Sequence, residues 1–169
     1  SLTGHMVFST LHTNDAAGAY TRLVDMGVEP FLVASTVEGI MAQRLVRTLC
    51  PECKKPWSPS RDELPHDFPW DTYQSVGLPL YLPGGCRTCR NLGYKGRLGI
   101  YELLITTEKV RALAQERASS WAVKQAAMSE GMRTLRVDGW NKVLSGRTSV
   151  EEILRATKSD TVAKSLGPA

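Results

Sequence analysis

The sequence predicts an α/β protein whose chain is interrupted by a zinc-bound four-cysteine module and ends in a bundle of short helices. A β-prone apolar run at residues 6–11, followed by amphipathic helical segments, indicates the α/β part. Two Cys-x-x-Cys pairs, which use every cysteine of the chain, indicate the metal module. Helical patterns that end in glycine after residue 108 indicate the C-terminal bundle.

The first elements follow from local signals. We expect residues 6–11, Met-Val-Phe-Ser-Thr-Leu, to form a buried strand, although such a strand needs neighbours on both sides and only five residues precede it. Asn14 or Asp15 can cap a helix over 16–26, which Gly27 would end in a left-handed conformation. Pro30 opens a third element, and apolar residues recur there at helical spacing as far as Val46, so we expect a helical core segment.

The cysteines lie in two close pairs, Cys50 with Cys53 and Cys86 with Cys89, which match the tetrahedral ligand set of structural zinc. The 32 residues between the pairs are no obstacle, because loop-closure entropy grows slowly with length. The alternatives are two disulfides or four unrelated core cysteines. With no hydrophobic export signal at its start, the chain is expected in a reducing compartment, where such pairs indicate metal. Four thiolates leave no open coordination position, so the metal would stabilise the fold and not catalyse.

The segment between the pairs contains six of the nine prolines and no sustained periodicity. It is therefore predicted to be an irregular insertion held at its base by the metal, and the helices after residue 120 should depend little on that metal. Past the second pair we expect a strand at 100–104, helices at 108–116, 120–130 and 134–144, and glycines 131 and 146 at helix ends. Ser149 and Glu152 form a capping box for one more helix, to residue 157, and residues 158–169 are expected to be a flexible tail.

The net charge and the hydropathy of the sequence argue against some classes of function. The formal net charge is +4, and four thiolates with one Zn²⁺ add −2, which leaves +2. This mild balance argues against a dedicated nucleic-acid binder, although a basic zinc ribbon stays an alternative. No stretch of the sequence is long and apolar enough to span a membrane.

Several motifs together resemble one family. Residues 4–16, Gly-His-Met-Val-Phe-Ser-Thr-Leu-His-Thr-Asn-Asp-Ala, resemble the histidine box of the secretion ATPase superfamily, the hexameric motors of type II secretion and type IV pilus assembly. Ala-Gln-Arg-Leu-Val-Arg at 42–47, Gly-Tyr-Lys-Gly-Arg at 93–97 and Gly-Met-Arg-Thr-Leu at 131–135 resemble the C-terminal region of the same family. The cysteine pairs fall where the tetracysteine element of its secretion and pilus-assembly branches lies. The resemblance covers residues 1–157.

The resemblance implies a fold and a set of site residues. Residues 1–47 would be the C-terminal portion of a RecA-like P-loop ATPase domain, 48–97 the inserted zinc module, 98–157 a C-terminal helical bundle and 158–169 a tail. His12 and Thr10 would sense the nucleotide, Thr13 would bind it, and His5, at the other end of the strand, is a further candidate. Polar groups at the carboxyl end of a strand can orient a water that attacks the terminal phosphate. Without the resemblance, two histidines flanking an apolar strand are more often structural.

The resemblance also implies partners and a cellular location. The complete protein would be a homohexamer in the bacterial cytoplasm, associated with the inner membrane through the cytoplasmic parts of platform proteins, and would use ATP and Mg²⁺ beside structural Zn²⁺. The sequence contains no Gly-Lys-Ser or Gly-Lys-Thr, so the phosphate-binding loop is missing. We therefore expect the C-terminal third of a motor, which does not hydrolyse ATP alone.

Three hypotheses about the function remain at this point. Residues 23–31 and 44–50 favour type II secretion, with pilus assembly as the alternative. The alternative of another class is a free-standing zinc module that binds protein or nucleic acid.

Overall fold

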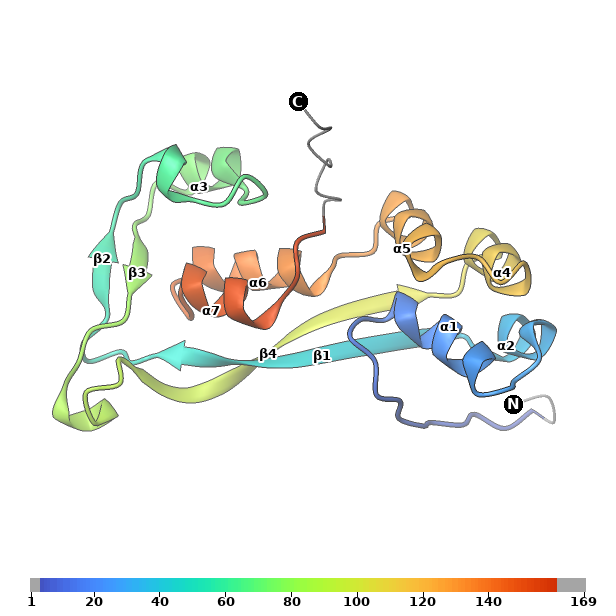
Figure 1. The fold of residues 1–169 in the computed structure, drawn as a ribbon. Helices are drawn as coiled ribbons and strands as arrows, with labels where there is room; N and C mark the ends of the chain where they lie inside the picture. The colour runs from blue at the N-terminus through green and yellow to red at the C-terminus, as the bar shows by residue number, and fades with distance from the viewer. Residues whose placement is uncertain (1–3, 161–169) are drawn as a thin grey trace, which may run out of the picture. The chain divides into compact units, whose positions relative to one another are not determined.

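The computed structural model describes residues 4–160, which form two compact units. One unit contains the residues up to Gln43 together with Tyr101–Leu135, and the other contains Arg44–Ile100 together with the residues from Arg136 onward. Strands β1 (Gly39–Leu49) and β4 (Tyr94–Ile105) pair with each other and supply residues to both units (Figure 1). Each unit is therefore built from stretches that are far apart in the sequence.

The first unit packs four helices with one half of this strand pair. The helices are α1 (Ala17–Asp25), α2 (Pro30–Thr36), α4 (Glu108–Gln115) and α5 (Ser120–Ser129). Helix α1 packs on α2 and α5, and α4 packs on the same two helices. Their shared core is made of small and branched side chains and one aromatic ring: Ala16, Ala17, Tyr20, Val33, Ala34, Leu104, Val110, Ala114, Val123 and Ala127.

The helix ends in this unit follow the sequence signals. The carboxylate of Asp15 accepts a hydrogen bond from the backbone N of Gly18 at 2.9 Å, which satisfies one free N–H at the start of α1. Gly27 follows α1 with φ of 88°, and Pro30 is the first residue of α2. The side chain of Thr107 accepts from the backbone N of Val110, and that of Ser119 from Ala122, so α4 and α5 are capped as well. The predicted bounds of α1, α4 and α5 are confirmed to within one or two residues.

The strand predicted at residues 6–11 is wrong. These residues have no regular secondary structure, and Met6 and Phe8 are 82% and 89% exposed. A strand is stabilised by a hydrogen-bonded neighbour, and no strand pairs with this segment among residues 4–160. The β-prone residues alone therefore do not form the element.

The helix predicted from Pro30 to Val46 is wrong in its second half. Helix α2 ends at Thr36, Val37 is extended, and residues 39–49 form β1. Pairing with β4 outweighs the helical spacing, because strand formation depends on cross-strand contacts more than on local pattern. Val46 is fully buried as expected, but Met41 and Leu45 are exposed and do not belong to the core.

The second unit contains the cysteine module, and the segment between the cysteine pairs is more ordered than predicted. Strands β2 (Lys55–Trp57) and β3 (Leu80–Leu82) form an antiparallel pair in which Pro56 lies opposite Tyr81. Between them lie a short 3₁₀ helix, η1 (Arg61–Glu63), and helix α3 (Trp70–Val76), which Gly77 ends with φ of 65°. A second 3₁₀ helix, η2 (Arg87–Cys89), directly follows Cys86 and ends at Cys89, the two cysteines of the second pair.

Helices α6 (Leu135–Leu144) and α7 (Val150–Ala156) complete this unit and agree with the predicted bounds. The Ser149 side chain accepts from the backbone N of Glu152, which is the expected cap of α7. Trp140 of α6 and Ile153 of α7 are buried. Residues 161–169, most of the predicted tail, lie outside the described residues. Among residues 4–160, no helix has the length and hydropathy that crossing a membrane would require.

Candidate functional site

The four cysteines converge into one cluster. The Sγ atoms of Cys50 and Cys86 are 3.8 Å apart, those of Cys53 and Cys89 are 3.7 Å apart, and those of Cys86 and Cys89 are also 3.7 Å apart. All four Sγ atoms lie within 4.8 Å of one another. Cys50 and Cys89 are buried, whereas Cys53 and Cys86 are partly exposed. The sequence therefore identified four residues that the fold brings together.

The spacing of the sulfur atoms fits a tetrahedral metal. Zinc binds thiolate at about 2.3 Å, so the edges of a tetrahedron of four sulfurs are about 3.8 Å long. A disulfide would place two sulfurs about 2.05 Å apart, and all four cysteines are free. The geometry therefore favours metal over the disulfide alternative, and the four close thiols argue against unrelated core cysteines.

The first cysteine pair lies on a tight turn directly after β1. The backbone N of Cys50 donates to the carbonyl of Gly93 at 2.9 Å, which ties this turn to the residues before β4. The backbone N atoms of Cys53 and Lys54 both donate to the carbonyl of Cys50, at 3.3 and 3.0 Å. These bonds turn the chain so that the Sγ atoms of Cys50 and Cys53 face the same point.

The second pair is held by backbone donors to sulfur. The backbone N of Cys86 and the backbone N of Gly93 donate to the Sγ of Cys89 at 3.4 and 3.2 Å. Gly84 lies so close to the first turn that a Cβ there would be 2.0 Å from the carbonyl oxygen of Cys53. A side chain at this position would push the two pairs apart, which explains why glycine is needed.

The thiols of Cys89 and Cys53 differ in their pKa values. Burial raises the pKa of Cys89, but the N–H groups of Cys86 and Gly93 stabilise its thiolate more, and its pKa falls to about 6. Burial and hydrogen bonds to the other three thiols raise the pKa of Cys53 to about 12. Four neighbouring thiolates repel one another, so a cation is required before all four can ionise together.

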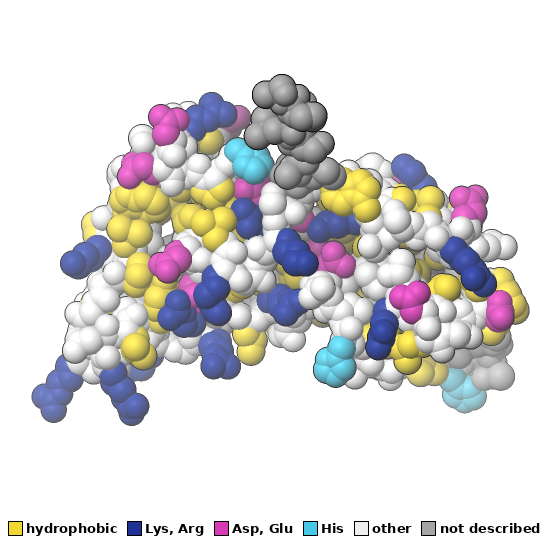
Figure 2. Space-filling view, in the orientation of Figure 1, with side chains coloured by type: hydrophobic (Ala, Val, Ile, Leu, Met, Phe, Trp, Pro, Cys, Tyr) yellow, Lys and Arg dark blue, Asp and Glu magenta, His cyan; other side chains and the backbone are white. Residues whose placement is uncertain are grey.

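Lys54, the basic residue directly after the first cysteine pair, has partners other than the thiols. The Lys54 ammonium donates to the carbonyl of Gly146 at 3.0 Å and lies 4.0 Å from the ring centroid of Tyr81. Lys and Arg side chains project at the lower left of Figure 2, where Figure 1 has the loop between β3 and β4. The Lys54 ammonium is therefore held by Gly146 and Tyr81.

Sequence reasoning missed a buried carboxylate beside the first cysteine pair. Glu152 is 0% exposed and binds the backbone N and the guanidinium of Arg47 at 2.8 and 2.6 Å, together with the guanidinium of Arg155. Burial raises the pKa of Glu152, but these bonds and charges outweigh it and bring the pKa to about 2. Glu152 thus links the end of β1 to α7. Its only sequence signal was the capping box, which assigned it a different role.

Glu102 is a second buried carboxylate that was missed, in the first unit. It accepts from the backbone N of Ala16 at 2.9 Å and of Leu135 at 3.2 Å, and so fixes the start of α1 directly after the histidine box. Burial raises its pKa, although the two backbone donors oppose that effect. A charged residue between the apolar residues of the run 100–104 was the signal that could have identified it.

The histidine-box residues lie on one irregular segment of the first unit. His5, Thr10 and His12 are exposed, and Thr13 is partly buried. The Thr13 hydroxyl donates to the carbonyl of Asp15 at 3.0 Å. The segment therefore presents the side chains of His5, Thr10 and His12 on the surface.

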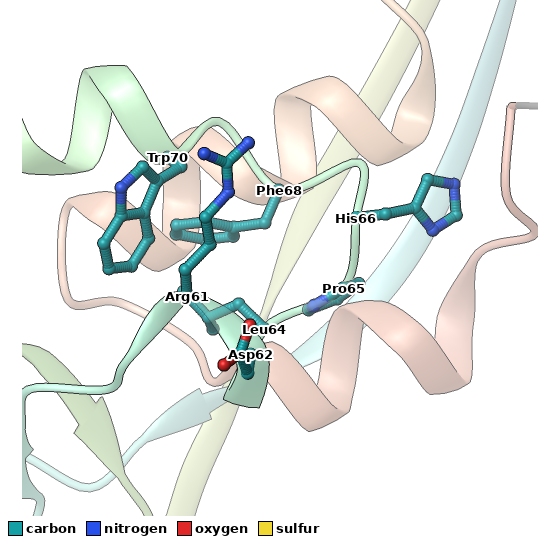
Figure 3. Close-up of a pocket in the computed structure, with 7 residues that line it drawn as sticks. All are labelled: Arg61, Asp62, Leu64, Pro65, His66, Phe68 and Trp70. Atoms are coloured by element: carbon teal, nitrogen blue, oxygen red, sulfur yellow. The ribbon is translucent and has the colours of Figure 1, made fainter.

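A pocket of roughly 270 Å³ lies in the segment between the cysteine pairs and is lined by Arg61, Asp62, Leu64, Pro65, His66, Phe68 and Trp70 (Figure 3). Beside it, Asp67 forms a two-bond ion pair with Arg136 of α6, at 2.5 and 3.0 Å. The ring of Phe68 packs edge-on against that of Trp140, with centroids 5.4 Å apart. These contacts attach the inserted segment to α6 at a second place, away from the cysteines.

The family model for type II/IV secretion system proteins matches residues 1–155. The chain belongs to this family. The match runs through the histidine box, both cysteine pairs and the helices that follow, so the cysteine module lies inside the family's region and the alternative of a free-standing zinc module loses its support. The resemblance stated from the motifs is confirmed.

Relatives from both branches of the family are similar to the chain at nearly equal identity. A type II secretion system ATPase E of Vibrio cholerae is 46% identical over 158 residues, and a type II secretion system protein E of Dickeya dadantii is 45% identical over 160 residues. A type IV pilus assembly ATPase TfpB of Acinetobacter baylyi is 45% identical over 155 residues. The matches cover 92–95% of this chain but only 26–31% of these relatives, so the chain spans about a third of their length or less.

Proposed function

We propose that the chain is the C-terminal part of a hexameric ATPase that drives pseudopilus assembly and protein export in a type II secretion system. The observation that carries this proposal is the family match across residues 1–155, with relatives named as secretion and pilus ATPases at about 45% identity. Pilus assembly is the competing assignment within the same family. We retain type II secretion as the preferred branch on residues 23–31 and 44–50.

The four cysteines hold a structural zinc ion in this proposal. When bound, the ion neutralises the thiolates and joins the two turns that carry Cys50, Cys53, Cys86 and Cys89. The sulfur spacing supports a closed four-coordinate site, which leaves no position for water or substrate. The module is thus a bracing or docking element, and residues 48–97 are its proposed extent.

The histidine box belongs to the nucleotide site of the assembled motor. We assign residues 1–47 to the end of a RecA-like domain, with His12 and Thr10 sensing the terminal phosphate, Thr13 contacting the nucleotide and His5 in a secondary position. The exposed apolar side chains of residues 6–8 support this, because an exposed apolar run is expected to be covered by further protein in the assembled motor. ATP and Mg²⁺ then bind to groups outside these 169 residues, so this chain alone does not hydrolyse ATP.

The remaining assignments follow from the same family. Residues 98–157 form the C-terminal helical subdomain, and most of the predicted tail at 158–169 lies outside the described residues. The complete protein works in the bacterial cytoplasm at the inner membrane, as a homohexamer in contact with the cytoplasmic parts of platform proteins. Nucleic acid is not a partner.

A chimera tests the proposal. The region of the Vibrio cholerae type II secretion ATPase E that matches residues 1–155 is replaced by those residues, and ATP hydrolysis and secretion are measured. We expect both to be retained, and His12→Ala to lower hydrolysis at least tenfold, which corresponds to about 1.4 kcal/mol of barrier. The matched control is His66→Ala, which removes the histidine outside the box and should change hydrolysis less than twofold.

The results of the chimera experiment distinguish the competing hypotheses about the function. A hexameric chimera without hydrolysis, or hydrolysis by the 169-residue chain alone, would overturn the proposal. The same replacement in the Acinetobacter baylyi pilus ATPase tests the branch: full pilus assembly there, with poor secretion in Vibrio cholerae, would assign the chain to pilus assembly.

A further inference from the structure

A second pocket of the Arg44–Ile100 unit is lined almost entirely by arginine. Its lining residues are Leu45 and Arg47 of β1, Arg97 of β4 and Arg155 of α7, and its volume is roughly 450 Å³. Three guanidinium groups thus converge from two paired strands and a helix. None of them belongs to the cysteine cluster or to the histidine box.

The buried carboxylate that binds two of the lining arginines, Glu152, is already saturated. Oε1 of Glu152 accepts from Arg47 at 2.6 Å and from Arg155 at 2.8 Å, while Oε2 accepts from the backbone N of Arg47 at 2.8 Å and from Arg155 at 3.0 Å. One negative charge therefore serves two arginines. It has no remaining position for a third.

Arg97 is the uncompensated charge. It is exposed, and within residues 4–160 it has no hydrogen bond or ion pair. It lines the same pocket as Arg47 and Arg155, where like charges repel one another. In addition, the buried Nε of Arg47 finds no acceptor among the described residues. Glu152 binds two of the three lining arginines, and Glu151 of α7 adds a second negative charge near Arg155, so the lining keeps an excess of positive charge that an anionic ligand would neutralise.

The surroundings favour a protein carboxylate over a phosphate. Sites for small phosphate groups commonly use backbone N–H groups at a helix N-terminus, whereas α7 contributes to this pocket a residue of its last turn, Arg155. Arginine forks match carboxylates in two-bond pairs, as Arg155 already does with Glu152. Leu45, which is 54% exposed in the same lining, offers an apolar contact, and arginine beside apolar surface is typical of protein interfaces.

We propose that the pocket of Leu45, Arg47, Arg97 and Arg155 is a docking site for an acidic segment of a protein partner, whose Asp or Glu side chain pairs with Arg97. Arg97 makes the selective contact because its guanidinium is free, and Arg47 and Arg155 are held in place by Glu152. The proposal does not depend on ATP hydrolysis or on the branch of the family.

Binding of a defined peptide to the 169-residue chain tests the proposal. The probe is a capped eight-residue peptide of alternating Glu and Ala, followed through the NMR signals of the arginine Nε–H groups at low salt. We expect saturable shifts at Arg97, with affinity in the millimolar range, and at least a tenfold loss in Arg97→Glu. The matched control is Arg147→Glu, which makes the same change of charge at an exposed arginine of this unit outside the pocket lining and should weaken binding less than threefold.

Two further measurements distinguish the possible outcomes: binding of inorganic phosphate, and binding of the peptide to Arg97→Lys. Inorganic phosphate should bind at least tenfold more weakly than the peptide, and equal or tighter binding of phosphate at Arg97 would replace the carboxylate site by a phosphate site. Equal losses in Arg97→Glu and Arg147→Glu would mean general charge attraction and would overturn the pocket. No shift at Arg97 in a folded chain would also overturn it. Arg97→Lys, which keeps the charge but loses the fork, should lose about threefold to tenfold.

Discussion

Replacing Glu152 by glutamine tests whether the buried carboxylate stabilises the unit that holds the cysteines. The pKa of Glu152 falls from an ordinary 4.5 to about 2, because the donors and charges of Arg47 and Arg155 outweigh burial. One pKa unit corresponds to about 1.36 kcal/mol, so the ionised carboxylate contributes at most about 3 kcal/mol of folding free energy. The side chains of Arg47 and Arg155 are 42% and 59% exposed, and solvent screening reduces our expectation to about 2 kcal/mol.

The pH dependence of this contribution has a definite sign. The pKa of Glu152 is lower in the folded state than in the unfolded state, so its stabilisation is complete above about pH 4.5. As the pH falls, the unfolded chain takes up the proton first, and the stabilisation disappears as the pH approaches about 2. The difference in unfolding free energy between the parent chain and Glu152→Gln should therefore be largest at neutral pH and shrink through this window.

Urea unfolding followed by tryptophan fluorescence measures this difference. Three of the four tryptophans, Trp57, Trp70 and Trp140, lie in the unit that contains Glu152, so the signal reports on that unit. The matched control is Glu151→Gln, which neutralises the adjacent exposed carboxylate and should change stability by less than about 0.5 kcal/mol. A loss below about 0.5 kcal/mol in Glu152→Gln, or a loss that is constant from pH 7 to pH 3, would refute the reasoning.

Three further predictions concern the cysteine module. Native mass spectrometry should find one zinc per chain and a weaker or absent zinc in Cys50→Ser; a chain that folds with no metal would contradict the site. Gly84→Ala should lower the zinc affinity at least tenfold in a chelator competition, because its Cβ would meet the Cys53 carbonyl oxygen at 2.0 Å. The control Gly85→Ala, whose Cβ has its nearest contact at 3.5 Å, should leave the zinc affinity unchanged. Equal affinities in the two variants would refute the packing argument. Asp67→Asn should lower the free energy of unfolding by about 1–3 kcal/mol, because Arg136 is buried and loses its ionic partner. Hydrogen exchange should then rise at residues 61–76. Unchanged exchange there would show that the ion pair does not hold this segment.

The parts of the fold that were predictable depend on residues close together in sequence. The two Cys-x-x-Cys spacings identified four thiols that the fold brings within 4.8 Å. Gly27 and Ser149 marked helix ends correctly, because capping involves only the adjacent turn. These signals act over three or four residues, and no distant contact competes with them.

The parts that were missed depend on distant contacts. Residues 39–46 carry a helical apolar pattern but pair with β4, a strand that begins at Tyr94. The partner of Glu152, Arg47, is 105 residues away in the chain. Such contacts are chosen by packing in the whole fold, and a single sequence contains no local record of them.

The cysteine module is attached to the last two helices by bonds on both sides of the metal ligands, and this changes what metal loss should do. Just before the first pair, the backbone N of Leu49 donates to the carbonyl of Arg147, and just after it Lys54 donates to the carbonyl of Gly146. The segment between α6 and α7 is therefore held by the same turn that carries Cys50 and Cys53. Loss of zinc should raise hydrogen exchange at residues 145–149 as well as at β2 and β3, while α5, which has its core in the other unit, keeps its protection. The sequence predicted that the helices after residue 120 would depend little on the metal, and these bonds make the segment between α6 and α7 an exception to that prediction.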